Sequence, residues 1–165
     1  MAPAPALANG SATATVSSQA AIIRRLTLVK TADLQFGTNI GGNTTGTVVV
    51  GPSGSVSSTG GVVRAGGTTS AAQFYAFSQR NETASVKIGA NFINITRLGG
   101  GATMRVDTFT ISSTPPSTLS TTNTTFTLNT PNGIFPFTIG ATLHVGVHQM
   151  PGTYTGTFSV TMTYN

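Results

Sequence analysis

A length of 165 residues suits a single domain with a sizeable core, and the absence of cysteine excludes disulfides, zinc–thiolate sites and a cysteine nucleophile. Charged residues make up only 7% of the chain, against about 25% in an average soluble protein, so hydroxyl and amide groups must wet most of the surface. The net charge of +5 comes from scattered Lys and Arg residues, which argues against nucleic-acid binding. No apolar stretch reaches the ~20 residues of a membrane span, so membrane insertion is not expected.

The first ten residues have the character of a linker. They carry Pro3 and Pro5, and they lack the basic and apolar regions of a whole signal peptide. The segment Ala6-Leu7-Ala8 is nevertheless similar to the small-x-small end of such a peptide. We therefore expect residues 1–10 to form a linker-like segment and residues 11–165 to form a single β-sandwich domain.

Period-2 alternation dominates the chain, and no 3.6-residue period of useful length is found, so strands are predicted throughout. The first alternating segment, residues 11–23, sets small apolar residues against Thr13 and Thr15. Its apolar face continues beyond this strand, breaks near Ala32-Asp33 and then resumes. The residues on that face are Ala12, Ala14, Val16, Ile22, Leu26, Leu28, Leu34 and Phe36.

Further strands follow at regular intervals, separated by segments rich in Gly, Pro and Asn. A kink is expected in one of the longer strands, at Pro136 or Gly140. Loops are predicted at 41–43, 51–54, 60–61, 66–67, 99–101, 115–116 and 131–133. The predicted strands are 46–50, 62–64, 72–77, 85–88, 92–96, 104–111, 124–128, 134–145 and 154–164. Many short strands with regular turn signals predict an all-β sandwich or barrel.

The last predicted strand, 154–164, shows the clearest alternation in the chain. Thr and Ser occupy every second position and form a hydroxyl-coated outer face, which is typical of a half-buried antiparallel strand. The other face is apolar, and with Leu26, Leu28 and Phe36 it is expected to line the core or a groove. The residues on this apolar face are Tyr154, Phe158, Val160, Met162 and Tyr164.

The few residues able to carry chemistry are poorly spaced for it. Asp33, Glu82 and Asp107 lie far apart in the sequence, in turn or strand-start contexts, so no two-carboxylate site is expected. Asp33 is interpreted as the cap of the bend at Ala32-Asp33, and Asp107 is predicted to lie on the polar side of its strand. On one strand, His144 and His148 would lie about 13 Å apart, too far to share a metal without a bend. We therefore expect no catalytic residue, no cofactor and no metal ion.

Three further patterns are interpreted as structural rather than functional. Counting alone does not exclude a Ser-His-Asp triad, but the Gly-x-Ser-x-Gly motif of a nucleophile elbow is missing. The glycines at 99–101 precede neither a helix nor a Lys-Ser/Thr pair, so they predict a flexible turn and not a phosphate loop. Tyr75 and Phe77 share one face of a predicted strand, and we expect that face to belong to the core rather than to a sugar-binding platform.

Three stretches, 26–37, 99–110 and 151–165, resemble a family of bacterial secreted domains of formerly unknown function found in Gram-negative surface proteins. That family is similar in layout to the spore-coat-protein-U-like pilins of archaic chaperone–usher fimbriae, although this chain lacks their cysteines. The resemblance extends from about Ser11 to the C-terminus. It implies an immunoglobulin-like antiparallel sandwich on the bacterial cell surface, exported through the periplasm and completed by a strand from a neighbouring subunit.

The segment 11–23 is the element on which the functional prediction depends. Its small inward residues suit a narrow cleft, in which backbone hydrogen bonds supply most of the contact. If it is donated, the chain is a pilin-like structural subunit of an extracellular filament, a head-to-tail homopolymer for which a periplasmic chaperone and an outer-membrane usher are candidate partners. If it completes its own sandwich, the chain is instead a monomeric secreted adhesin or carbohydrate-binding module. Both alternatives remain open.

Overall fold

The computed structural model describes residues 27–77, 82–128 and 132–164. Strands take up 65% of these residues and none of them is helical, which confirms the all-β prediction. In the same ranges, no helix is long and apolar enough to cross a membrane. The strands in chain order are β1 (Thr27–Ala32), β2 (Gln35–Phe36), β3 (Asn39–Val50), β4 (Val56–Arg64), β5 (Thr69–Ser70), β6 (Ala72–Phe77), β7 (Glu82–Ile88), β8 (Phe92–Arg97), β9 (Thr103–Ile111), β10 (Ser117–Thr118), β11 (Thr124–Leu128), β12 (Ile134–Val145), β13 (Tyr154–Thr155) and β14 (Val160–Tyr164).

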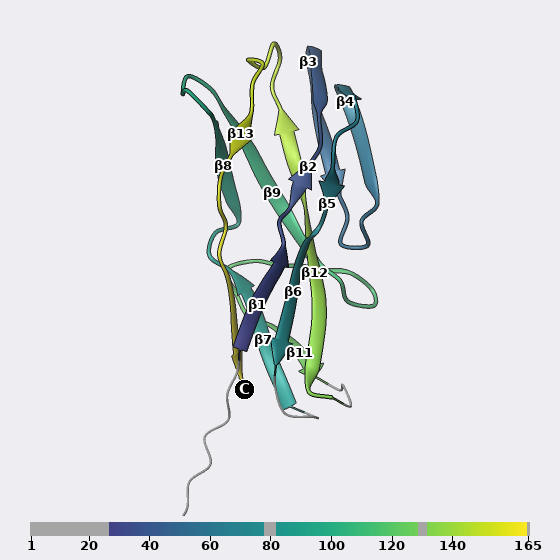
Figure 1. Cartoon of the computed structure of the whole chain (residues 1–165), viewed down its shortest axis with the longest axis vertical. Helices are drawn as coiled ribbons and strands as arrows, with labels where there is room; N and C mark the ends of the chain where they lie inside the picture. Colours follow the sequence, from purple (N-terminus) through teal and green to yellow (C-terminus); the bar gives the residue numbers. More distant parts are fainter. Residues whose placement is uncertain (1–26, 78–81, 129–131, 165) are drawn as a thin grey trace, which may run out of the picture.

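The strands form two main layers that pack as an antiparallel sandwich. The large sheet has the order β1-β6-β12-β9-β8-β13, with β3 on β12, β4 on β3 and β10 on β9. The small sheet has the order β11-β7-β14, and β2 pairs with β5 in a separate ribbon. Figure 1 shows an elongated molecule in which β7 and β11 lie at the end where β1 begins, and β3 and β4 extend to the other end. The shared core contains Phe109 and Ile139 from the large sheet and Val86 and Leu128 from the small one.

Strand β12 is central to the large sheet because it changes partner halfway along. Its first half pairs with β6 and its second half with β3, while β9 runs along its other edge. The change falls at Gly140, where an added Cβ would lie 2.1 Å from the carbonyl oxygen of Val50. Since no side chain fits there, the glycine allows the backbone of β3 to approach closely. The irregularity predicted within this strand therefore lies at Gly140.

Two neighbouring segments cross from one sheet to the other. In the small sheet β7 pairs with β14, and in the large sheet the following strand β8 pairs with β13. The crossing is tight: a Cβ on Gly156 would lie 2.8 Å from a side-chain carbon of Ile95. The single strand predicted at 154–164 is therefore wrong in its continuity, because residues 156–159 make no ladder between β13 and β14. Its alternation is confirmed: Thr155, Thr157, Ser159, Thr161 and Thr163 are all exposed.

The inner face of this last segment is less completely buried than its sequence suggests. Met162 is buried, whereas Tyr154, Phe158 and Val160 are half-buried. Tyr164 belongs to β14, but its side chain lies outside the described part of the structure. Leu28 and Phe36 are also half-buried and contact the core, and Leu26 lies outside the described residues.

Two other predictions need correction. The glycine pairs expected as loops at 41–43 and 60–61 lie within β3 and β4, where the ladder shifts register between Gly41 and Gly46. Tyr75 and Phe77 are not core residues: their side chains are 39% and 42% exposed, and the residues between and before them are buried instead. Both faces of β6 carry apolar residues, so the alternation alone did not reveal which face turns inward.

Candidate functional site: an open seam between the two sheets

Among the residues that the structure describes, one side of the sandwich is joined by backbone hydrogen bonds, and the opposite side is not. The segment after β10 bridges both sheets, because Leu119 N donates to Phe109 O at 2.7 Å and Ile88 N donates to Ser120 O at 3.0 Å. On the other side, the large sheet ends at β1 and the small sheet ends at β14. Within the described ranges, β1 pairs only with β6 and β14 only with β7. We call the side between β1 and β14 the seam.

The topology places these two edges on the same side of the molecule. Strand β14 continues from β13, and β13 lies on the edge of β8 that faces away from β9. The link between β7 and β8 and the link between β13 and β14 cross from one sheet to the other side by side. Strand β14 therefore lies on the edge of β7 that is opposite the joined side. In Figure 1 the C-terminus, just after β14, appears at the end of the molecule where β1 begins. The sandwich is therefore a partly closed barrel with one open side.

Apolar side chains at the seam are only partly covered. Leu28 on β1 and Val160 on β14 are half-buried although both contact the core. Phe158, just before β14, is also half-buried and has its ring centre 5.0 Å from that of the fully buried Phe109. By contrast, an apolar residue on a central strand is fully covered: Ala76 on β6 is 0% exposed. The seam thus combines free strand edges with accessible apolar groups, which is the chemistry that accepts an added strand.

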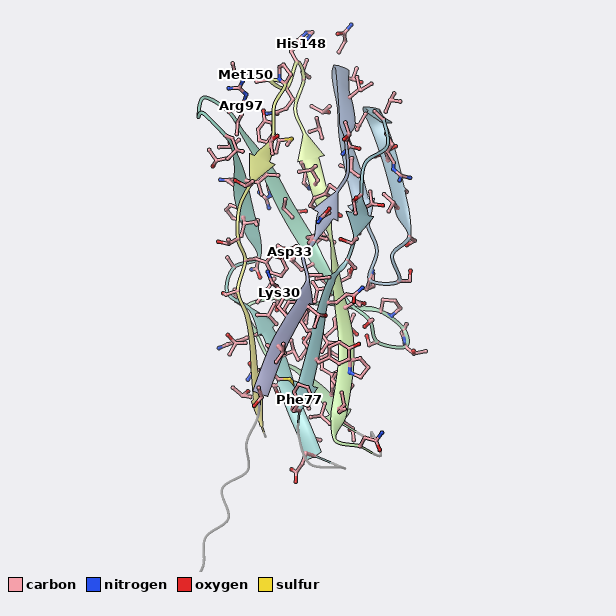
Figure 2. The ribbon with its side chains drawn as sticks, in the orientation of Figure 1. Lys30, Asp33, Phe77, Arg97, His148 and Met150 are labelled. Atoms are coloured by element: carbon pink, nitrogen blue, oxygen red, sulfur yellow. The ribbon has the colours of Figure 1, made fainter. Side chains whose placement is uncertain are left out.

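Lys30 shows how open the seam is. Its cross-strand partner is Phe74, a buried residue, so Lys30 occupies the same inward-facing side of β1 as Leu28. Its side chain is nevertheless 55% exposed and forms an ion pair with Asp33, as the labelled pair in Figure 2 shows. An inward-pointing charge on an edge strand is a known device against unspecific strand pairing. Lys30 follows Leu28 by two residues, so the alternation places both on the same face of the strand. A charged residue on this apolar face is the signal in the sequence that marks the edge.

The predicted donor residues Ala12, Ala14, Val16 and Ile22 lie outside the described residues. Their insertion into a seam therefore stays a prediction. What the structure adds is the place where the described chain begins: Thr27 opens β1, which is one of the two edges of the seam.

The residues considered for chemistry are found on separate elements, with one exception. Asp33 follows β1, and Glu82 opens β7. Asp107 on β9, however, accepts a hydrogen bond at its Oδ1 from His144 Nε2 of β12, with 2.8 Å between the two atoms. No serine is hydrogen-bonded to His144 among the residues described. Sequence reasoning missed this pair because it depends on the register of β12 against β9.

Asp107 also interacts with two neighbours in its own strand. Arg105 Nε donates to its Oδ2 at 2.9 Å and Thr108 Oγ1 donates to its Oδ1 at 3.0 Å. Burial by itself would raise the pKa of Asp107, but the hydrogen bonds from His144, Thr108 and Arg105 outweigh it, so the pKa lies below its ordinary value. The carboxylate is therefore held ionised on the polar side of β9, as the sequence predicted for its side of the strand.

The two histidines do not share a site. His144 lies in β12, whereas His148 lies in the turn beyond it, with φ of 49°, and is labelled at one end of the molecule in Figure 2. Within residues 27–77, 82–128 and 132–164, no group of three His, Cys, Asp or Glu residues is placed to hold a metal ion.

Comparison with known proteins gives one match. A family model described as a domain of unknown function (DUF4402) matches residues 26–164, a range that contains every strand of the two sheets. No curated protein and no solved structure matches the chain. The chain therefore belongs to the DUF4402 family.

Proposed function

We propose that the chain is a structural subunit of an extracellular bacterial filament. In this proposal, residues 11–23 of one copy occupy the seam between β1 and β14 of the next copy. The observation that carries the proposal is the seam itself: two strand edges, each paired on one side only, with half-buried Leu28, Phe158 and Val160 between them.

A strand in the seam would correct two features that leave the sandwich incomplete, the unpaired strand edges and the accessible apolar side chains. Its backbone would pair with the free edges of β1 and β14, and its small side chains would cover the accessible apolar groups. If each copy donates its predicted N-terminal strand to the seam of the next, the contact is head-to-tail and propagates as a fibre unless the ring closes. The strand would also have to pass Lys30, whose ammonium group already reaches solvent beside Asp33.

The sequence between the N-terminal strand and β1 favours donation over self-completion. To fill its own seam alongside β1, the chain would have to reverse direction between residue 23 and Thr27. Tight hairpins need Gly, Asn or Asp at the turn. This stretch reads Ile23-Arg24-Arg25-Leu26 and contains none of them. A strand that continues straight into a neighbouring copy needs no such turn.

Composition and resemblance support the cellular setting. A charge-poor, Thr-rich and cysteine-free chain suits an extracellular β-protein, and the resemblance to coat-protein-U-like pilins suggests export through the periplasm to the bacterial surface. An open seam is an aggregation hazard in a subunit that has not yet assembled. We therefore include a periplasmic chaperone that covers the seam, and an outer-membrane usher, in the proposal.

Deletion of residues 1–23 tests the proposal. We expect the truncated protein to form no filaments in negative-stain electron microscopy and to be poorly soluble, because its seam stays open. A peptide of residues 11–23, added during refolding, should yield soluble capped subunits. If the truncated protein is instead a soluble monomer as stable as the intact chain, residues 11–23 do not fill a seam at all.

A pair of substitutions distinguishes insertion of residues 11–23 into the seam from unspecific effects of a bulky side chain. Ala14→Trp puts a bulky side chain on the inward face and should abolish filaments, since a narrow cleft resists added volume. Thr15→Trp puts the same side chain on the outward face and should leave filaments intact. Equal behaviour of the two variants would show that the segment does not insert in the predicted orientation.

A further inference from the structure

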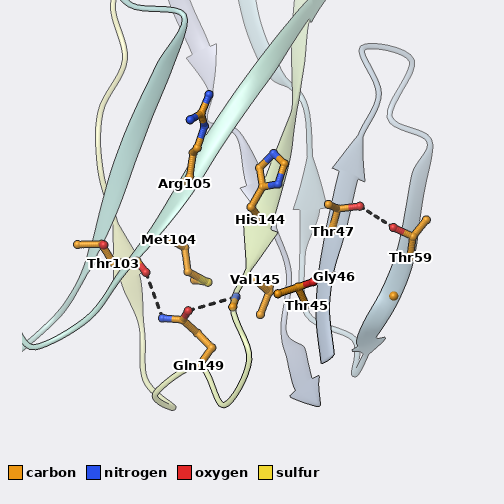
Figure 3. Close-up of a pocket in the computed structure, with 12 residues that line it drawn as sticks. Thr45, Gly46, Thr47, Thr59, Thr103, Met104, Arg105, His144, Val145 and Gln149 are labelled. Atoms are coloured by element: carbon orange, nitrogen blue, oxygen red, sulfur yellow. Dashed lines mark hydrogen bonds between the residues drawn. The ribbon is translucent and has the colours of Figure 1, made fainter. Parts of the chain in front are cut away.

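A second concave surface involves β3 and β4, the strands that extend to the end of the large sheet opposite the start of β1. It is a cavity of about 510 Å³, open to solvent and lined by β3, β4, β9, β12 and the turn after β12. Figure 3 shows Arg105 and His144 on one side of it and Thr47 and Thr59 on the other. A volume of this order is typical of small-ligand sites.

The register of four strands aligns the polar residues of this surface in one row. Thr59 is opposite Thr47, Thr47 is opposite His144, and His144 is opposite Arg105. The row therefore presents hydroxyl, imidazole and guanidinium groups at the spacing of neighbouring strands, about 4.8 Å. The two threonine hydroxyls are 2.7 Å apart and hydrogen-bonded, so each holds the other in position.

Arg105 is held rigidly in this row. Its Nε donates to Asp107 Oδ2 at 2.9 Å, and its guanidinium carbon lies 4.3 Å from the centre of the Phe92 ring. The side chain is still 52% exposed, and in the described part of the chain its two terminal amino groups make no hydrogen bond. A guanidinium group fixed through Nε and stacked on a ring offers its outer donor pair at little entropic cost. That pair matches a carboxylate in two-point geometry.

The turn after β12, which lines the cavity at the end of the sandwich, is also held by side-chain contacts. Gln149 Nε2 donates to Thr103 O at 3.2 Å and to Tyr154 Oη at 2.8 Å, as Figure 3 shows for the first of these contacts. Tyr154 Oη in turn donates to Met150 O at 2.6 Å. These contacts tie the turn after β12 to β9 and β13. A shallow and hydroxyl-rich site suits a ligand that is itself rich in hydroxyl groups.

We propose that this cavity binds an acidic saccharide, whose carboxylate is held by the outer donor pair of Arg105 and whose hydroxyl groups contact Thr47, Thr59 and His144. Asp107 acts as a positioning residue, because it orients both Arg105 and His144 and has no need to touch the ligand. The site is separate from the seam and does not depend on polymerisation. In a filament, however, the site would repeat along the fibre, and weak binding at each copy would sum to firm attachment.

The test is a titration of the full-length protein with an oligogalacturonate, followed by ¹H–¹⁵N NMR. We expect saturable shifts of the amides around Arg105, His144 and Thr47, and little response to the same oligomer with its carboxylates methyl-esterified. Arg105→Gln should weaken binding by about tenfold or more, and Arg105→Lys by less, because lysine keeps the charge but not the two-point geometry. Lys87→Gln, which removes the same charge from β7 in the small sheet, should bind as the wild type does.

Three results would overturn the proposal. The first is no saturable binding of the oligogalacturonate, or equal binding of its methyl ester. The second is inorganic phosphate binding as tightly as the acidic oligomer, which would mark an unspecific anion site. The third is an equal loss in Arg105→Gln and Lys87→Gln, which would show that only the net charge matters. If Arg105→Gln does not fold, the proposal is tested by comparing Arg105→Lys with Lys87→Gln and by the methyl-ester control.

Discussion

Single residues in this protein act mainly through their positions on strands, and Asp107 is the clearest case. It lies on the polar side of β9, beside a buried Val106, and joins Arg105 of its own strand to His144 of β12. The sequence predicted its side of the strand but not its partners. Pairing across strands depends on register, and the sequence of one strand does not contain the register of the next.

The lowered pKa of Asp107 predicts a pH-dependent contribution to stability. A carboxyl group whose pKa is lower in the folded state stabilises the protein at pH values above its unfolded pKa of 3.8, and this contribution is lost as pH falls through the folded value. The stability that the ionised Asp107 contributes relative to Asp107→Asn should therefore shrink as pH falls below about 5. Urea unfolding of both proteins across this range measures it. If the difference in unfolding free energy between the two proteins does not change with pH, Asp107 does not have a lowered pKa in the folded state.

At the scale of elements, regular alternation predicted strands well and irregular segments poorly. The strands at 72–77, 124–128 and 134–145 have the bounds that the sequence predicted, because each shows alternation ended by a turn signal. The two-residue strands β5 and β10 were not predicted, since two residues carry no period, whereas β2 falls where the alternation was predicted to resume at Leu34 and Phe36. The interruption at 156–159 was missed because the alternation of Thr with apolar residues runs through it, although the chain there changes sheets.

Gly140 supports the partner change of β12, and its replacement should be costly. The Cβ in Gly140→Ala would collide with backbone atoms of Val50, Gly51 and Pro52. Val50 is held in the ladder of β3 with β12, and Gly51 is held in the following turn by its hydrogen bond to Ser55 O, so these atoms cannot give way easily. We expect a loss of about 2 kcal/mol or more in unfolding free energy, measured by thermal or urea unfolding. The control is Gly41→Ala in β3, where the added Cβ meets a Val145 side-chain carbon at an ordinary 3.4 Å. Comparable losses in both variants would mean that close backbone approach is not what requires Gly140.

At the scale of the whole molecule, the central feature is the seam. The sequence predicted a sandwich and indicated an unusual N-terminal strand, but it gave no direct sign of which edges stay open. That information lies in the order of strands in two sheets, with β1 and β14 as free edges on one side. The predicted lining residues Leu28, Phe158 and Val160 do meet there or next to it, and their partial exposure distinguishes the seam from the closed core, to which the buried Met162 belongs.

Cross-linking between copies tests the central claim most directly, and the chain suits it because it contains no cysteine. Ala14→Cys and Val160→Cys proteins would be mixed, refolded together and treated with a short bismaleimide, whose reach makes the result insensitive to the exact register of the strand. Thr15→Cys, on the outward face, replaces Ala14→Cys as the control. A double variant, Ala14→Cys with Val160→Cys, reports on linking within one chain.

The account predicts a cross-linked pair of chains, twice the 16.7 kDa mass of one copy, in the Ala14→Cys and Val160→Cys mixture and much less in the Thr15→Cys control. The contrary result is a mixture without cross-linked pairs, together with a double variant that links internally and stays at 16.7 kDa. That outcome would show that each copy fills its own seam.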